Sequence, residues 1–373
     1  MVNSNTLGII FPNSYDNLVP DLVKNRTVGS IPFAGRYHLI DFPLSGMVNA
    51  GIENVTVITK SNYRSLMEHL GNGREWDLSR KTGGLNLVPP FAHANNKVYH
   101  GRVEALNSII EFLEQQKERY VVISDCHVAS AVDYSDLIET HVKSGADATM
   151  VYERAPIADA IKSDNYTFVM NEDARITEIR CNDYRAGIQN LFMNIIIMDR
   201  DMLITMVKDA MMRGLVYLER DIFARCLNVL HVRGYEYTGY RARVCDMKSF
   251  FNENQRLIDP ANLHALFPKE RPVYTKVRDA APVRYAMDAR VKNSLVADGC
   301  IIEGEVENCV LFRGVKISKG AVVKNCVIMK DCVVEEGASL NHVVTDKNVT
   351  ISMGKAMSGT ATYPVYIDKG ATV

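Results

Sequence analysis

Short apolar runs alternate with helix-period segments over about the first 260 residues of the chain. Apolar residues at three- and four-residue spacing predict helices over residues 104–118 and 135–145. Runs of β-branched and other apolar residues predict buried strands at residues 7–11, 54–59, 120–124, 148–153 and 194–199. The alternation predicts an α/β domain with a mostly parallel sheet. Since such sheets bind ligands beyond the carboxyl ends of their strands, the loops after Phe11 and Ser124 are candidate sites.

The pattern changes near residue 285, where branched apolar residues begin to recur about every six residues. The recurring positions include Val291, Val296, Ile302, Val315, Val322, Val327, Val333 and Val349. Such hexapeptide repeats are typical of a left-handed parallel β-helix, whose stacked coils bury one continuous apolar column. At roughly 18 residues per coil, residues 285–373 would form about four coils. An exposed end coil needs covering, so we expect oligomer contacts through this domain.

Length and composition fit two globular domains. Residues 261–284 are charged and contain prolines, which predicts a linker between a domain at 1–260 and another at 285–373.

The formal net charge of the 373 residues is -1, so no global field favours nucleic acid or an anionic membrane. No apolar run reaches the roughly 18 residues of a membrane span. The eight cysteines form no C-x-x-C pair and no signal peptide is evident, which predicts reduced thiols in the cytoplasm.

The loop after the first predicted strand has an unusual composition. In this class of domain the first strand commonly feeds a glycine-rich loop that binds phosphate through backbone N–H groups. Here no glycine occurs between Phe11 and Val28. The chain therefore has the pattern of a nucleotide-binding domain without the loop that holds the nucleotide.

Four segments carry a resemblance to a known family. "PFAGRYHLIDFPLSGMVNAGI" (from Pro32) is similar to the pattern F-G-G-K-Y-R-L-I-D-F-x-L-S-N-x-V-N-S-G-I of the ADP-glucose pyrophosphorylases. "YHGRVEALNS" (from Tyr99), "DYSDLIETHVKSGADATM" (from Asp133) and "KSFFNENQRL" (from Lys248) also resemble segments of that family. The resemblance implies a Rossmann-like nucleotidyltransferase domain followed by a left-handed β-helix. It also implies a reaction of ATP with glucose 1-phosphate that uses Mg²⁺ and gives ADP-glucose and pyrophosphate.

The residues that the resemblance assigns to triphosphate binding are replaced. Counted without a gap from "GRYHLIDF", the glycines of the family's L-A-G-G-x-G-T-R-L become Asn13, Ser14 and Asp16. The Arg of that motif becomes Leu18, and the Lys of the following R-A-K-P becomes Val28. Glycine permits close approach of backbone to phosphate, whereas Asp16 would add a repelling charge.

The other two catalytic requirements of the family also fail. The Asp of G-D-H-I-Y corresponds to His127, and the Asp of D-V-G-T corresponds to Arg243. An arginine, which is always protonated, cannot replace a Mg²⁺-binding carboxylate. At the sugar-phosphate Lys of F-V-E-K-P the sequence has Cys181, Asn182 and Asp183. We therefore expect no Mg²⁺, no cofactor and no catalysis by this chain alone.

Several residues allow more than one interpretation. His127 is a general-base candidate or a hydrogen-bonded loop residue, and Arg243 either binds an anion or pairs with a neighbouring acid such as Asp246. His342 in the β-helix is weak evidence for an acyltransferase. The remaining candidates are three basic residues, which either bind an anionic sugar-phosphate or nucleotide effector or form a solvated loop: Lys24, Arg26 and Arg36.

The resemblance implies a non-catalytic, regulatory-type bacterial subunit that joins a catalytic subunit in a heterotetramer for glycogen synthesis. Two alternatives stay open. The first is an active nucleotidyltransferase with a displaced metal site that uses Asp125 and Asp246. The second is a free-standing protein that senses a sugar phosphate or a nucleotide.

Overall fold

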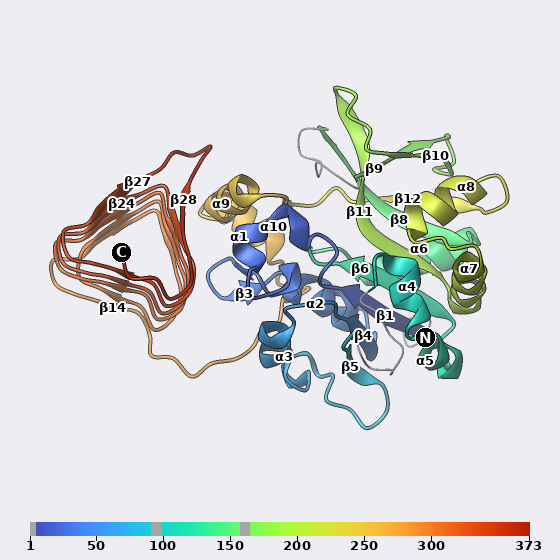
Figure 1. Cartoon of the computed structure of the whole chain (residues 1–373), viewed down its shortest axis with the longest axis horizontal. Coiled ribbons are helices and arrows are strands. Elements are labelled where there is room, and N and C mark those ends of the chain that lie inside the picture. The colour runs from blue at the N-terminus through green and yellow to red at the C-terminus, as the bar shows by residue number, and fades with distance from the viewer. Residues whose placement is uncertain (1–4, 91–98, 157–164) are drawn as a thin grey trace.

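The computed structural model describes residues 5–90, 99–156 and 165–373, which form a sheet domain and a β-helix packed side by side (Figure 1). Within the described residues the large sheet has nine strands. Its parallel part has the order β6 (Tyr120–Asp125), β1 (Thr6–Phe11), β4 (Asn54–Ile58) and β5 (Gly84–Val88). Phe11 lies opposite Asp125 in register, so the loops after β1 and β6 leave the sheet at the same edge.

The other side of the sheet is built on one long strand, β11 (Ile188–Asp199), which runs antiparallel to β6. Four further strands extend it: β8 (Ala148–Pro156), β9 (Tyr166–Met170), β10 (Ile176–Cys181) and β12 (Val232–Glu236). A bulge interrupts the pairing of β11 with β8 between Phe192 and Ile196. Bulges re-aim side chains, and this one contains Asn194 with a φ of 58°.

Helices cover both faces of the sheet, as the alternating pattern predicts. Leu7, Ile9 and Phe11 of β1 pack on one face, whereas Ile10 packs on the other. One face carries α4 (Arg102–Asn107), α5 (Ile110–Gln115), α7 (Arg200–Met212) and α8 (Ala224–Cys226). The opposite face carries α2 (Asp41–Asn49), α3 (Arg64–Leu70), α6 (Tyr134–Ser144) and α9 (Met247–Arg256).

The single helix predicted over residues 104–118 is wrong, because α4 and α5 are separate helices. Ile109 between them has φ −115° and ψ 18°, outside the helical region. The Ser108 hydroxyl donates a 2.6 Å hydrogen bond to the Ala105 carbonyl, which gives the last turn of α4 a local partner.

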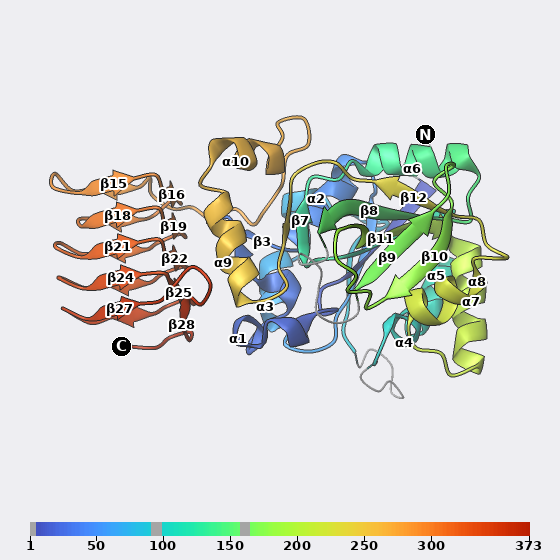
Figure 2. The same ribbon diagram turned by 90° about the horizontal axis from the view of Figure 1, so that it is seen from above.

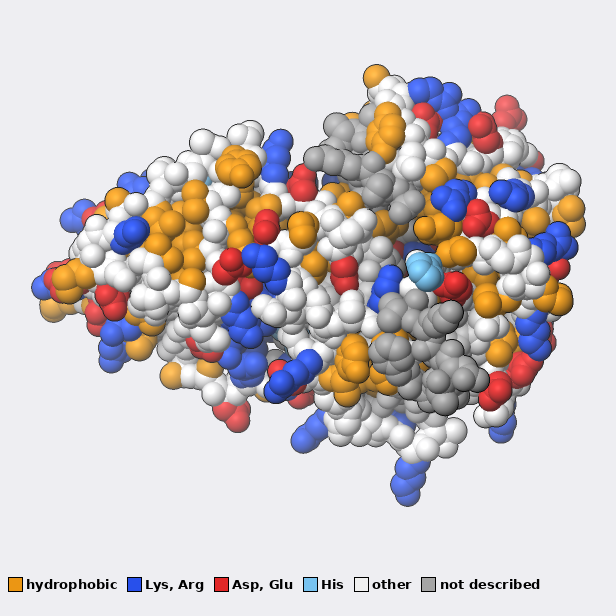
Figure 3. All heavy atoms as spheres, in the orientation of Figure 1, with side chains coloured by type: hydrophobic (Ala, Val, Ile, Leu, Met, Phe, Trp, Pro, Cys, Tyr) orange, Lys and Arg blue, Asp and Glu red, His pale blue; other side chains and the backbone are white. Residues whose placement is uncertain are grey.

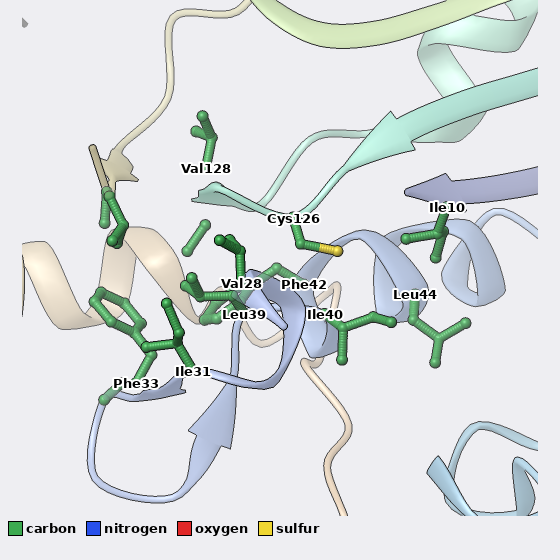
Figure 4. Packing of buried hydrophobic residues seen from close by; sticks show 14 of the residues in the cluster. Ile10, Val28, Ile31, Phe33, Leu39, Ile40, Phe42, Leu44, Cys126 and Val128 are labelled. Atoms are coloured by element: carbon green, nitrogen blue, oxygen red, sulfur yellow. The ribbon is translucent and has the colours of Figure 1, made fainter. Parts of the chain in front are cut away.

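The segment between β1 and α2 folds back against the sheet. It contains α1 (Pro20–Val23) and a hairpin of β2 (Pro32–Phe33) and β3 (Tyr37–His38), and its apolar residues form the core in Figure 4. Val28, Ile31 and Phe33 are buried there with Cys126. Gly29 packs so closely that a Cβ atom would lie 2.8 Å from the Cβ of Pro12. This contact holds the segment against the loop after β1.

The β-helix is a triangular prism of short parallel strands (Figures 1 and 2). The first face contains β14 (Arg284–Tyr285), β17 (Ile301–Ile302), β20 (Lys316–Ile317), β23 (Val333–Val334) and β26 (Thr350–Ile351). The second contains β15 (Arg290–Lys292), β18 (Glu305–Glu307), β21 (Val322–Lys324), β24 (Ser339–Asn341) and β27 (Ala356–Ser358). The third contains β16 (Leu295–Val296), β19 (Val310–Leu311), β22 (Val327–Ile328), β25 (Val343–Thr345) and β28 (Val365–Ile367).

Each face has five strands, so the expectation of about four coils was too low. The coils are shorter than expected: Arg290 lies opposite Glu305, 15 residues later, and Glu305 lies opposite Val322, 17 residues later. Asn293, Asn308 and Asn325 turn one corner with φ of 44°, 53° and 50°, which asparagine tolerates better than most residues. Their side-chain amides are joined by hydrogen bonds of 2.7 and 3.2 Å.

Two helices and a chain segment connect the domains. α9 and α10 (Pro260–Leu266) lie between the sheet and the β-helix in Figure 2. The predicted linker therefore begins with a helix, and residues 272–283 follow without helix or strand.

The remaining pair of strands, β7 (Val128–Ser130) and β13 (Arg241–Arg243), brings the segment before α9 beside the loop after β6. Within the described residues, no helix is both long enough and apolar enough to span a bilayer.

A buried ion pair joins the two domains. The Arg26 guanidinium donates to both carboxylate oxygens of Asp346, at 2.6 and 2.5 Å, and the two side chains are only 3% and 4% exposed. The Tyr366 hydroxyl donates to the same carboxylate at 3.0 Å. Nearby, the exposed side chains of Lys24 and Asp368 pair at 2.7 Å.

The Asp346→Ala variant should lose stability, because it leaves the Arg26 charge buried without its carboxylate. We expect the free energy of unfolding to fall by about 3–5 kcal/mol, measured by guanidinium denaturation. Lys24→Met, which breaks the exposed pair, should leave the denaturation midpoint essentially unchanged. Equal midpoints for Asp346→Ala and wild type would contradict the assigned role of the buried pair.

Candidate functional site

The loop after β1 is closed by its own side chains. The Asn13 side chain donates to Asp16 Oδ2 at 2.6 Å and to the Ser61 carbonyl at 3.1 Å, and it accepts from the Lys60 N–H at 2.9 Å. Asp16 Oδ1 accepts from the Val28 N–H at 2.9 Å. A phosphate-binding loop needs N–H groups that point to the ligand. Here side-chain oxygens already occupy the N–H groups of Lys60 and Val28.

Asp16 places a carboxylate in a poorly solvated position within this loop. Burial raises its pKa to about 6, although the hydrogen bonds from Asn13 and Val28 and the charge of Lys60 oppose the shift. The two apolar replacements differ in burial: Val28 belongs to the core, whereas Leu18 is partly exposed. The loop therefore has an acidic group and two aliphatic side chains where the family pattern has glycine, arginine and lysine.

Arg102 fills the space beside the closed loop. It starts α4, and its guanidinium pairs with Asp125 at 2.5 Å and with Glu219. It also donates to Asn194 Oδ1 at 3.3 Å, the side chain that the β11 bulge aims into the site. Ser14 Oγ donates to the other oxygen of Asp125 at 2.8 Å. Both acids are at most 5% exposed, so the guanidinium stabilises charges that burial would otherwise penalise.

The two positions that correspond to the family's metal carboxylates lie together, but they hold nitrogen groups. An Arg243 guanidinium nitrogen is 3.2 Å from His127 Nε2, and both residues are at most 5% exposed. Burial, then the neighbouring charge of Arg243, lowers the pKa of His127 well below its ordinary value. His127 Nδ1 has no hydrogen-bond partner in the described structure, and its ring packs on Tyr15 with centroids 4.4 Å apart.

Arg243 pairs with an acid, as one of the two interpretations expects, but the acid is Glu153 and not Asp246. Its guanidinium binds Glu153 at 2.5 Å, and Arg241 binds the other oxygen of the same carboxylate. Asp246 instead caps α9, where its carboxylate accepts from the Ser249 N–H at 2.7 Å. Since Asp125 is bound by Arg102 and Asp246 caps a helix, the alternative of a displaced two-carboxylate metal site has no support. These residues do not fit Mg²⁺, because a fixed guanidinium already supplies the local positive charge.

Asn182 stands at the end of β10 in a left-handed turn, with a φ of 54°. The backbone N–H of Asn182 donates a hydrogen bond to the backbone carbonyl of Asn165 at 2.9 Å. Asp183 beside it accepts from Arg185 at 2.6 Å. The position that the resemblance assigns to the sugar-phosphate lysine therefore forms a turn closed by local partners.

The remaining cavity is small. It encloses about 100 Å³ among residues that include Ser14, Tyr15, Arg102, Asn194 and Glu219. Nucleotide-sized ligands occupy pockets of roughly 300–1,000 Å³. In the described structure, the cavity is smaller than such pockets, and the charges of Arg102, Asp125 and Glu219 are paired with one another.

Of the three effector candidates, only Arg36 lies at a pocket. Arg26 is bound to Asp346 and Lys24 to Asp368, so the structure does not bring the three side chains together. Arg36 lines a strongly basic pocket between the β2–β3 hairpin, the linker and the β-helix. Its other basic residues are Lys276, Arg278, Arg313, Lys330 and Lys347. Burial, then the charge of Arg26, lowers the pKa of Lys347 to about 8, as expected where several cations converge.

The sequence analysis did not identify the residues that close the site. Tyr15, Arg102, Glu153 and Glu219 come from four separate segments and meet only through the sheet register and the packing of α4. One signal was present: Glu153 is a charged residue at the end of the strand predicted over residues 148–153, and a charge in a buried strand indicates a partner.

Comparisons with known proteins agree with this architecture. Residues 20–171 match the nucleotidyl transferase family, and residues 281–360 match the GlmU-like C-terminal hexapeptide family. The glycogen biosynthesis protein GlgD of Bacillus subtilis is 34% identical over 321 residues, which cover 86% of this chain and 83% of that protein. A glucose-1-phosphate adenylyltransferase of Clostridium perfringens is 33% identical over 310 residues, which cover 81% of this chain and 78% of that protein.

The pKa of Asp16 predicts a measurable pH dependence of stability. Its folded pKa of about 6 lies above the unfolded value of about 3.9, so the folded state binds the proton more tightly. This contribution is complete below about pH 4 and is lost as the pH rises through about 6. When the pH is raised from about 4 to above 6, the Asp16→Asn variant should therefore lose less stability than wild type does. Denaturation midpoints measured across this pH range test this. Asp21→Asn, at an exposed position, is the control, and identical pH profiles for wild type and Asp16→Asn would refute the assignment.

Proposed function

Because the chain belongs to the family of glucose-1-phosphate adenylyltransferases and GlgD glycogen biosynthesis proteins, we propose that it is a non-catalytic, regulatory subunit of glucose-1-phosphate adenylyltransferase in glycogen synthesis. One observation carries the proposal. The buried Arg243 and His127 occupy both positions of the metal carboxylates, at 3.2 Å from each other. Because the Arg243 guanidinium already places a positive charge at this site, Mg²⁺ would not bind there. In this proposal the chain has the fold of the family but does not catalyse its reaction.

A regulatory subunit acts through the free energy with which it favours one state of its partner. Such coupling is typically about 1–3 kcal/mol. In this proposal the chain joins a catalytic subunit in a closed heterotetramer in the cytoplasm. Two observations support the proposal. Tyr285 and Met287 in the first coil are exposed, and apolar side chains gather on the face of the β-helix seen in Figure 3. The eight cysteines are all free thiols, which suits a reducing compartment.

The basic pocket, which has a volume of about 40 Å³, is the proposed place for a small anion of the size of inorganic phosphate. Arg36, Lys276, Arg278, Lys330 and Lys347 line it from both domains and the linker between them. An anion there would offset repulsion among these cations and so favour the arrangement that brings them together. Because the pocket spans the domain boundary, an effector would act on the relative position of the two domains. It would not act on the site around Arg102 and Arg243.

The purified chain should release no pyrophosphate when it is incubated alone with ATP, glucose 1-phosphate and Mg²⁺. The physical reason is that His127 and Arg243 stand where the family pattern has metal-binding carboxylates, and that side-chain oxygens occupy the N–H groups of Lys60 and Val28. A coupled pyrophosphate assay measures this, with the catalytic subunit from the same cell as the positive control. Turnover near that of the control would refute the non-catalytic assignment.

A catalytic subunit mixed with this chain should co-elute with it in size-exclusion chromatography and change its kcat or its response to an anion. Inorganic phosphate serves as the anion probe, and the Arg278→Ala/Lys347→Ala variant should weaken the response while the two chains still co-elute. A Lys316→Ala variant, changed at an exposed position outside the pocket, is the matched control. If the two chains elute separately and the kinetics are unchanged, the subunit proposal is wrong.

A further inference from the structure

Two histidines and an aspartate meet beneath the basic pocket. His38 ends β3, Asp41 starts α2 and His69 lies in the last turn of α3. One potential ligand atom from each lies within 4.8 Å of the others. Among the described residues, this is the one group of three His, Cys, Asp or Glu side chains close enough to share a metal ion.

The group is held in place by the surrounding structure. Asp41 Oδ1 is 2.6 Å from His69 Nε2, and Asp41 Oδ2 accepts from the His38 N–H at 2.9 Å. The rings of His38 and His69 lie with centroids 3.8 Å apart, and the indole of Trp76 packs against His69 at 5.7 Å. Asp41 is fully buried and His69 is 7% exposed. Preorganised ligands of this kind lose little conformational freedom when they bind a metal.

Two further observations concern His38. Its Nδ1 atom is buried and has no hydrogen-bond partner in the part of the chain that the structure describes. A buried polar atom without a partner is costly, so such an atom beside other ligands indicates a missing ligand. The family pattern G-G-K-Y-R-L-I-D-F has arginine where this chain has His38. The replacement removes a permanent charge and supplies a metal-binding nitrogen.

We propose that His38, Asp41 and His69 bind one divalent transition metal ion of the zinc class. Two imidazole nitrogens and one carboxylate oxygen are a common ligand set for Zn²⁺ and related ions, whereas Mg²⁺ prefers oxygen ligands. The ion replaces the proton that joins His69 and Asp41, and that proton is released to solvent. His38 and His69 also line the basic pocket, so the fourth position of the ion faces the pocket.

The charge around the group determines which fourth ligand is expected. Lys347 and Arg278 lie near His38 and oppose a bare cation, whereas the Arg26 charge is largely offset by Asp346. An anion in the fourth position would bring a negative charge to both the metal ion and these side chains. The site is therefore expected to bind the metal ion together with an anion, for which chloride or inorganic phosphate in the buffer suffices.

The test uses the full chain, stripped of metal with a chelator and freed of any affinity tag. Titration with Zn²⁺ in phosphate-free, chloride-containing buffer, followed by calorimetry, should give one ion per chain and a raised unfolding temperature. Titration with Co²⁺ should give the visible absorption of a four-coordinate nitrogen and oxygen site. In the His38→Arg variant both signals should be lost. Since arginine is the residue of the family pattern, this variant should fold, with an unchanged circular dichroism spectrum.

The matched control is His264→Ala, at an exposed histidine outside the group, which should bind Zn²⁺ as wild type does. Three results would each overturn the proposal. The first is no stoichiometric binding by wild type, and the second is binding that survives His38→Arg. The third is the near-ultraviolet band of cobalt–thiolate ligation, which would place the ion at cysteines instead.

Discussion

A buried guanidinium must have a carboxylate beside it, and this requirement organises the site of the sheet domain. Arg102 holds Asp125 and Glu219, while Arg243 shares Glu153 with Arg241. Each group is costly to bury alone, so the network is stable only when complete. The strands and helices that supply these six side chains are thereby fixed relative to one another without metal or substrate. The same charges that would repel Mg²⁺ maintain the local structure.

The second buried ion pair has a different role, because it joins the two domains. Arg26 lies in the segment that follows the closed loop, and Asp346 lies in the β-helix. Gly29 then packs this segment against Pro12, at the start of the same loop. The segment that contacts the β-helix through Arg26 therefore contacts the loop after β1 only three residues later. The basic pocket lies along the same boundary and offers a second point at which binding could bias the domain arrangement.

The sequence predicts well those features that depend on neighbouring residues. The hexapeptide period is a local property, so the β-helix could be identified from the positions of its valines and isoleucines, whereas coil length depends on how the corners turn and was misjudged. The same holds for the helices: the apolar spacing of residues 104–118 is real, but the backbone at Ile109 divides it. Register in the large sheet is not a local property. It decides that Arg243 meets Glu153, while the nearer Asp246 is already engaged by the N-terminus of α9.

The distance along the chain between Arg26 and Asp346 has a consequence for synthesis. The two residues are 320 positions apart, so at about 5–20 residues per second the ribosome needs roughly 15–60 s to make the partner of Arg26. For about the last quarter of that interval the sheet domain is complete in sequence, but Arg26 still has no Asp346 to pair with. The charge of Arg26 therefore gains its buried partner only after β25 has been made, late in the synthesis of the chain.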